Sequence, residues 1–268
     1  MRSRGALRSF GALRGSGSGS ARQRALNAML AALSGGSVFT ANYYAYSGAK
    51  VTDWIDHLDP THALTQATDA NRAPLPVADS ALGGALSSTH SALQYYGSSR
   101  ATSTWKRFHD GTGGGTCTIW VPHTTHTSNL FLGFTSTGSG EGAYSSANDS
   151  GTDGRIGLNV RNSGGAIANP YPAGDWYTQG TGHVLRADYL EGASPGEARI
   201  YSNGTLAGSA NTSAGPTNGN PALTLYNGYA AASWVWRWHA TIVPPAAWTA
   251  AQIAAVDAYV KSLGLVGA

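Results

Sequence analysis

Short strand-like runs separated by turn residues fill most of the sequence from about residue 38 to residue 243. In residues 155–161, Ile156, Leu158 and Val160 alternate with other residues and therefore share one face of a strand. No helical pattern separates these runs, which argues against a parallel sheet with crossover helices. The pattern predicts an antiparallel sandwich built from residues 119–121, 130–134, 155–161, 183–190, 198–208, 222–227 and 233–243.

The segment ARIYSNGTLAG, residues 198–208, is the strongest local signal. Two strand-like halves flank Asn203 and Gly204, and this dipeptide supplies the positive φ angles of a type I′ turn. The segment predicts a tight hairpin. The 36 glycines and the low content of charged residues, 12%, suit a β protein with many such turns.

Near its C-terminus the chain changes to a helical pattern. Thr249 is the expected N-cap, Gln252 completes a capping box, and Trp248 is placed to pack on Ile253 as a hydrophobic staple. Gly264 is the expected end of the helix. The buried stripe is predicted to be Ile253, Val256, Val260 and Leu263.

The N-terminal residues differ in charge from the rest of the chain. The first 36 residues hold six arginines and no acidic residue, whereas the remainder has a net charge of −3. Gly-Ala-Leu-Arg occurs at residues 5–8 and again at 11–14, and the linker-like GSGSGS follows at 15–20. A helix is expected at about 21–33, with Ser20 as N-cap and Leu26, Met29, Leu30 and Leu33 as its apolar stripe.

This charge asymmetry divides the chain into a basic arm, residues 1–36, and a domain, residues 37–268. We expect the arm to leave the body and bind an acidic surface. A protein subunit is favoured over nucleic acid, because Phe10 is the sole aromatic residue there that could stack on bases. The predicted contacts are Arg2, Arg4, Leu7, Arg8, Leu13, Arg14, Arg22 and Arg24.

Five segments in order resemble a known family. They are VTDWIDHLDPTHALTQATDANRAPL at 51–75, in which Ala73 separates Arg72 from Pro74, ALGGALSSTHSALQYYG at 81–97, FHDGTGGGTCTIWV at 108–121, the hairpin at 198–208, and VPPAAWTAAQIAAVDAYVKSLGL at 243–265. Together they resemble the concanavalin A-like, or laminin G-type, jelly roll of bacteriophage virion proteins. The resemblance covers roughly residues 40–268 and implies a jelly-roll fold that binds sugars or proteins.

Catalytic motifs are missing from the sequence. Glycosidases need two carboxylates that flank the scissile bond, but the chain has three glutamates, Glu141, Glu191 and Glu197, and no strand with paired carboxylates. It also lacks a Gly-x-Ser-x-Gly elbow and a phosphate-binding loop, and DGTGGGT at 110–116 is interpreted as a turn. We therefore expect no enzymatic activity and no cofactor.

Metal and thiol chemistry are not expected either. His123 and His126 would face opposite sides of a strand, and Asp53, Asp56 and Asp59 match no calcium loop, so solvated or capping roles are favoured. Asp149 and Asp153 are interpreted in the same way. Cys117, the single cysteine, lies in an apolar run and is expected to be buried and unpaired.

Trp234, Trp236 and Trp238 alternate along one predicted strand, so their indoles should share a face. A buried core is favoured, with at least two of the rings mostly buried. A glycan-binding platform is the alternative.

These observations lead to two hypotheses about function. The first is a structural protein of a phage particle, made in the host cytoplasm, that forms a homo-oligomer and is anchored to other virion proteins by its arm. Capsid decoration, head fibre and tail remain open as its place. The alternative is a lectin-like module that binds a surface glycan. No run of about 18 apolar residues exists, so no membrane helix is expected.

Overall fold

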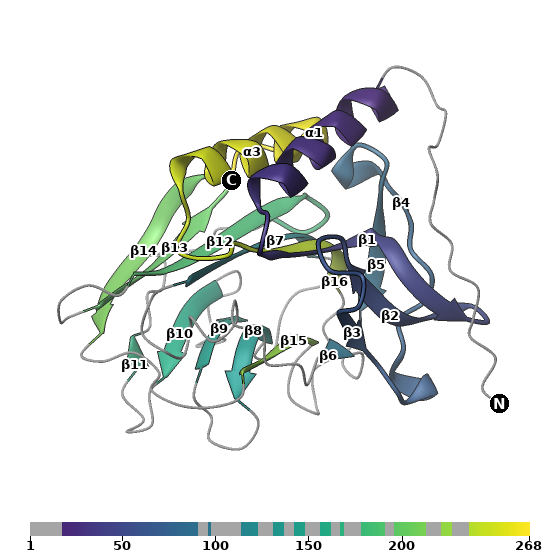
Figure 1. Cartoon of the computed structure of the whole chain (residues 1–268), viewed down its shortest axis with the longest axis horizontal. Coiled ribbons are helices and arrows are strands. Elements are labelled where there is room, and N and C mark those ends of the chain that lie inside the picture. The colour runs from purple at the N-terminus through teal and green to yellow at the C-terminus, as the bar shows by residue number, and fades with distance from the viewer. Residues whose placement is uncertain are drawn as a thin grey trace.

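The computed structural model describes residues 18–90, 96–97, 114–122, 131–136, 142–147, 156–161, 167–168, 178–190, 196–212, 221–226 and 236–268. In these ranges the chain forms mainly antiparallel strands, with one helix near each end of the sequence (Figure 1). The helices are α1 (Ser18–Ala32) and α3 (Ala250–Ser262), and two 3₁₀ turns are η1 (Asp69–Asn71) and η2 (Ser80–Leu82).

The strands in chain order are β1 (Ser37–Ser47), β2 (Lys50–Asp56), β3 (Ala63–Thr65), β4 (Val77–Asp79), β5 (Ala85–His90), β6 (Tyr96–Gly97), β7 (Gly114–Pro122), β8 (Phe131–Ser136), β9 (Gly142–Ala147), β10 (Ile156–Arg161), β11 (Ile167–Ala168), β12 (His183–Leu190), β13 (Gly196–Ser202), β14 (Thr205–Thr212), β15 (Pro221–Tyr226) and β16 (Trp236–Val243). All seven predicted strand regions overlap these strands, and the predicted antiparallel sandwich is confirmed.

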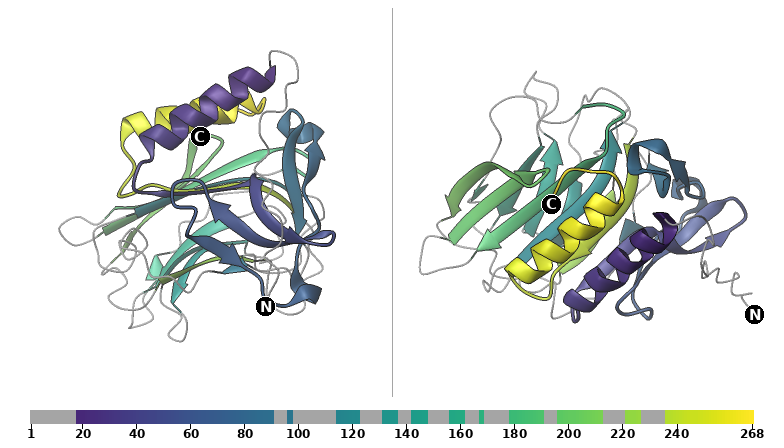
Figure 2. Two further views of the ribbon diagram at one scale, coloured as in Figure 1. Left: turned by 45° about the vertical axis from the view of Figure 1, so that its right-hand side comes forward. Right: turned by 90° about the horizontal axis from the view of Figure 1, so that it is seen from above.

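All strands except β4 and β5 form one hydrogen-bonded path that curls back on itself, in the order β11-β10-β9-β8-β15-β6-β3-β2-β1-β16-β7-β12-β13-β14. Strand β5 pairs with β16 beside this path, and β4 pairs with β5. The helices cover the outer side of the layer that contains β1, β16, β7 and β12, and the layer of β8, β9, β10 and β15 lies on its other side (Figures 1 and 2). The molecule therefore has a helical layer over a β-sandwich.

Strand β7 shows how alternation builds two cores on the two faces of one layer. Cys117, Ile119 and Val121 are buried with the helices, whereas Trp120 is buried with residues of the sandwich interior. Because side chains alternate across a strand, a continuous apolar run such as this one is fully buried on both sides.

Strand β16 reverses its alternation at a β-bulge. Trp236 and Trp238 point into the sandwich. On a regular strand Ala240 and Ile242 would point the same way, but they pack under the helices. The pairing of β16 with β7 shifts register between Trp238 and Ala240. His239 is the extra residue of this bulge, and it turns the side chains that follow it to the opposite face. One strand therefore supplies both cores.

Two local predictions are confirmed. Asn203 and Gly204 have φ angles of 47° and 78° and join β13 to β14. Thr249 and Gln252 form the complete capping box of α3. Among the helices in the described part of the chain, none is long and apolar enough to cross a membrane.

Candidate functional site

The tryptophans that the sequence offered as a glycan platform are core residues. Trp236 and Trp238 have 0% exposed surface, so the favoured prediction of burial is confirmed for both. Trp238 packs on Trp54 with ring centroids 4.7 Å apart, and Trp236 packs on His90 at 5.3 Å. Neither indole offers a face to a sugar, and the alternative role is wrong for these two. Trp234 lies outside the described residues.

The N-terminal helix belongs to the body rather than to a separate arm. Leu26, Met29 and Leu33 of α1 are buried in the cluster that also contains Val256 and Val260 of α3. The expectation that residues 1–36 leave the body is therefore wrong for α1, because the apolar stripe of α1 packs against α3 of the same chain.

Of the predicted arm contacts, the structure places two. Arg22 donates a hydrogen bond of 2.7 Å to the carbonyl of Gly83, next to η2, and Arg24 is exposed. Arg22 thus holds α1 to the body, and its predicted role as a contact to an acidic partner is wrong. The other contacts lie outside the described residues: Arg2, Arg4, Leu7, Arg8, Leu13 and Arg14.

A buried polar pair fixes the second helix to the sheet. His239, on the bulge of β16, donates from Nδ1 to the carbonyl of Leu86 at 2.6 Å, because a carbonyl can only accept. Its Nε2 is then the acceptor for the Tyr259 hydroxyl at 2.7 Å. Burial lowers the pKa of His239 to about 4 and raises the pKa of Tyr259. The pair is closed to solvent and serves as a structural lock.

The aspartates considered as calcium ligands make structural hydrogen bonds. Asp56 is fully buried and accepts from the backbone N–H groups of Val38 and Leu58, each at 2.9 Å. Asp53 accepts from the hydroxyl of Thr65 at 2.7 Å. Asp59 accepts from both the N–H and the hydroxyl of its neighbour Thr61. The favoured capping roles fit these contacts.

The remaining metal and thiol predictions are tested only in part. Within the ranges that the structure describes, no cluster of three metal-ligating side chains occurs. His123, His126, Asp149 and Asp153 lie outside those ranges. Cys117 is buried and unpaired, as predicted, and burial raises the pKa of its thiol to about 12, which makes it a poor nucleophile.

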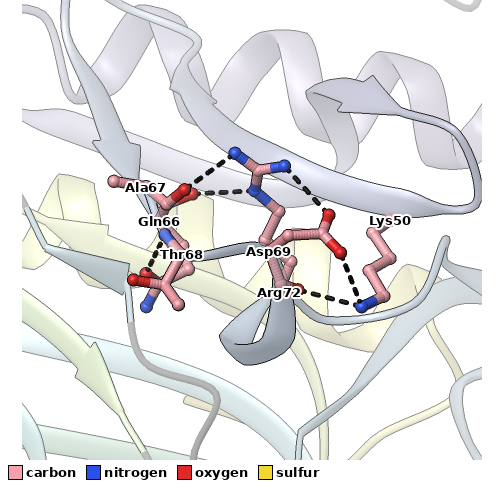
Figure 3. Close-up of polar contacts among 6 residues, drawn as sticks. All are labelled: Lys50, Gln66, Ala67, Thr68, Asp69 and Arg72. Atoms are coloured by element: carbon pink, nitrogen blue, oxygen red, sulfur yellow. Dashed lines mark hydrogen bonds and ion pairs between the residues drawn. The ribbon is translucent and has the colours of Figure 1, made fainter.

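A polar loop follows β3 and contains the QATDANR part of the family-like motif (Figure 3). Its first residue, Gln66, is buried, and residues 67–70 are exposed. The Arg72 guanidinium donates to the carbonyls of Gln66 and Ala67 and to the Asp69 carboxylate, at 2.9, 3.0 and 3.1 Å. Lys50, from β2, donates to the carbonyl and the carboxylate of Asp69. Hydrogen bonding to Lys50 holds the pKa of Asp69 below its ordinary value. These groups face one another, so the cluster shapes the loop.

Carboxylates suited to glycoside hydrolysis are not paired in the described strands. Glu197 is bound to Arg199 at 2.5 Å, and this hydrogen bond lowers its pKa, whereas a catalytic acid needs a raised pKa. Glu141 and Glu191 lie outside the described residues.

No family model matches the sequence, and a search of curated proteins finds no match. Solved structures do match the fold. A GH54 α-L-arabinofuranosidase mutant soaked with 4-nitrophenyl α-L-arabinofuranoside aligns with a TM-score of 0.57 and 15% identity, over 88% of this chain and 61% of that one. An arabinofuranosidase complexed with arabinofuranosyl-α-1,2-xylobiose aligns with a TM-score of 0.55 and 15% identity, over 88% of this chain and 60% of that one.

The binding domain of botulinum neurotoxin DC in complex with SialylT aligns with a TM-score of 0.50 and 10% identity. The alignment covers 87% of this chain and 52% of that one. The chain therefore spans between about half and three fifths of the length of these structures. At such identities the matches show a shared concanavalin-like sandwich and leave the activity open.

Proposed function

We propose that the protein is a non-catalytic module that binds a carbohydrate on a cell surface or in the extracellular matrix. The proposal is carried by the sandwich fold, which it shares with a toxin binding domain solved with SialylT and with arabinofuranosidases solved with sugar ligands. Because one fold hosts many functions, the proposal depends on a site on this chain's own surface.

The non-catalytic reading is supported by the contacts of three carboxylates in the part of the chain that the structure describes. Retaining and inverting glycosidases place two carboxyl groups on either side of the bond, one with a raised pKa. Asp56 is buried in backbone hydrogen bonds, Asp69 is bound by two cations, and Glu197 is bound to Arg199. These carboxylates are held by the protein rather than directed at a substrate.

The test is glycan binding by the purified full chain. An array of neutral and anionic glycans is probed first, and hits are measured by isothermal titration calorimetry. We expect saturable binding to at least one glycan, which heat-denatured protein lacks. A folded chain that binds no glycan above the denatured control would show that the proposal is wrong.

A second candidate is a structural component of a phage particle, as capsid decoration, head fibre or tail. What favours it is the arginine-rich strip that directly precedes α1, a helix fixed to the body by Met29 and Leu33. A partner bound by this strip would be held close to the domain. In this candidate the protein resides in the virion as a homo-oligomer.

Deletion of residues 2–14 tests the second candidate, because it removes four arginines and leaves α1 whole. We expect the deleted protein to fold but to fail to join particles, as measured by mass spectrometry of purified virions. Incorporation at the wild-type level would rule out anchoring by this strip.

A further inference from the structure

Strand β14 ends the hydrogen-bonded path, and no described strand pairs with its outer edge. Seen from above, β13 and β14 extend past α3 on the side away from α1, so the helices do not cover this edge (Figure 2). Two side chains of β14, Ser209 and Asn211, are exposed. The strand therefore presents a row of backbone N–H and C=O groups at the margin of the sheet, and such a row is a template for pairing with another chain.

The other edges among the described strands are short, and one of them carries a proline. Strand β11, at the opposite end of the path, has two residues. Strand β4, which pairs with β5 alone, has three residues and directly follows Pro76. Short edge strands and prolines are the devices by which natural proteins prevent pairing between molecules. Strand β14 has eight residues, and none of them is charged or a proline. It is therefore the least protected of these edges.

A β-bulge sets the part of β14 that is regular enough to pair. The register with β13 shifts at Ala207, and residues 208–212 then pair one to one with β13. Five residues are an ordinary length for a strand. Ser209 and Asn211 lie opposite the exposed charged residues of β13, whereas Ala210 packs partly on the sandwich core. We call residues 208–212 the β14 edge.

The β14 edge is complementary to itself. When two copies of residues 208–212 run antiparallel and pair along their whole length, Ala210 lies opposite Ala210 of the second copy. Ser209 then lies opposite Asn211 of the second copy, and the two share the outer face of the sheet. A hydroxyl and a side-chain amide can each donate and accept hydrogen bonds, so they suit one another. No charge lies directly opposite a like charge.

The charges of β13 also fit this arrangement. Arg199 pairs with Ser209, and Glu197 pairs with Asn211. In the paired copies a single row therefore runs from Arg199 of one copy, across both β14 strands, to Glu197 of the other. Because neighbouring strands lie about 4.8 Å apart, these two opposite charges are about 14 Å from one another. At that distance they favour the antiparallel orientation more than they add affinity.

We propose that the β14 edge is a homodimer interface, in which β14 pairs antiparallel with β14 of a second copy about a two-fold axis at Ala210. Backbone hydrogen bonds then continue the sheet from one copy into the other. A second copy suits the edge better than an unrelated peptide, because the edge is complementary to itself and two-fold dimers are the commonest closed assemblies. This inference goes beyond the proposed function and does not depend on glycan binding.

Charge substitutions at two exposed positions test the interface and its register in the full chain. Ser209→Lys and Asn211→Asp each place two like charges diagonally across the two-fold axis. The double variant, which carries both substitutions, instead places each lysine directly opposite an aspartate of the other copy. Ser34→Lys makes the same exchange as Ser209→Lys at an exposed position outside the edge and is the control. Sedimentation equilibrium measures the dissociation constant of the dimer.

We expect the wild type to dimerise and each single substitution to raise the dissociation constant about tenfold or more. The double variant should return to within about threefold of the wild type, and Ser34→Lys should stay within about twofold. Melting temperatures check that each variant is folded. A wild type that is monomeric at every concentration would overturn the proposal and leave the edge to a different partner. A dimer that neither single substitution weakens would show that the copies meet elsewhere, and a double variant that stays weak would overturn the register.

Discussion

Gly204 determines the geometry of a whole hairpin through one backbone angle. Its φ of 78° lies in the left-handed region, and a Cβ there would also approach the backbone oxygen of Ala268 at 3.3 Å. The glycine thus serves both the turn and the packing of the C-terminal segment against it.

We expect Gly204→Val to lower the free energy of unfolding by about 1–3 kcal/mol, because a β-branched residue is strained at positive φ. Urea denaturation measures the change. Thr205→Val, at the next and exposed position, is the control and should change the free energy by less than about 0.5 kcal/mol. Equal effects of the two substitutions would contradict the argument from φ.

His239 makes the stability depend on pH. Its pKa is about 4 in the folded protein, chiefly because of burial, against an ordinary value of 6.5. The ring faces the Leu86 carbonyl and the Tyr259 hydroxyl, with the charges of Arg22 and Asp79 nearby. Between these two pKa values the unfolded chain binds a proton that the folded chain does not.

The free energy of unfolding should therefore fall as the pH decreases from 6.5 to 4, by up to about 3 kcal/mol for this residue. His57, whose pKa burial also lowers to about 4, adds to the fall in the same window. Urea titrations at several pH values compare the wild type with His239→Gln. The variant should be less stable than the wild type at pH 7, but its free energy of unfolding should fall less as the pH decreases. If the free energy of unfolding depended on pH equally in both proteins, His239 would not be the source of the pH dependence.

At the scale of elements, Gln252 joins two helices that lie far apart in the sequence. Its Oε1 accepts from the Thr249 N–H in the capping box of α3, and its Nε2 donates to the carbonyl of Ala32 at the end of α1. One amide group therefore satisfies the start of one helix and the end of the other. This explains why glutamine suits this buried position better than glutamate.

We expect Gln252→Glu to lower the free energy of unfolding by about 1–2 kcal/mol at pH 7, because a carboxylate keeps the capping box but turns an acceptor toward the Ala32 carbonyl. Gln23→Glu is the matched control, since Gln23 is exposed on α1 and bonds only Asn27 among the described residues. Its effect should stay below about 0.5 kcal/mol. If Gln252→Glu left the free energy of unfolding unchanged, the hydrogen bond from Gln252 to Ala32 would contribute nothing to stability.

The sequence predicts those elements whose signals are local. The hairpin depends on Asn203 and Gly204, and the capping box on Thr249 and Gln252, so a few neighbouring residues suffice. The contact between Gln252 and Ala32 spans 220 residues, and the bulge at His239 depends on pairing with β7. Neither the Gln252–Ala32 contact nor the bulge has a signature in neighbouring residues. Because the partner of α1 lies so far along the chain, the sequence predicted that α1 leaves the body.

The arrangement of polar residues on the strands could be predicted only in part for the same reason. Alternation along residues 183–190 and 198–208 is enough to place Asp188 and Arg199 on one side of their strands. Their alignment into one row requires the register between strands, and the position of Trp248 over Gly115 requires the tertiary structure. The Trp236 and Trp238 pattern was the clearer sequence signal, yet it belongs to the core.

At the scale of the whole molecule, α1 and α3 share one buried cluster over the sheet and should behave as one cooperative unit. We expect Met29→Ala, which opens a cavity where the side chain is fully buried, to cost about 2–5 kcal/mol. Hydrogen exchange should accelerate in both α1 and α3. Ala28→Ser, at an exposed position, is the control, and acceleration confined to α1 would show that the helices open separately.

The pairing of α1 with α3 also has a consequence for synthesis of the chain. The ribosome makes α1 early, but Gln252 follows Ala32 by 220 residues. At about 5–20 residues per second, the apolar stripe of α1 waits roughly 10–45 s before its partner helix emerges. During this interval Leu26, Met29 and Leu33 lack the α3 members of their buried cluster, Val256, Tyr259 and Val260. The nascent chain therefore offers a hydrophobic helix to chaperones until translation has almost finished.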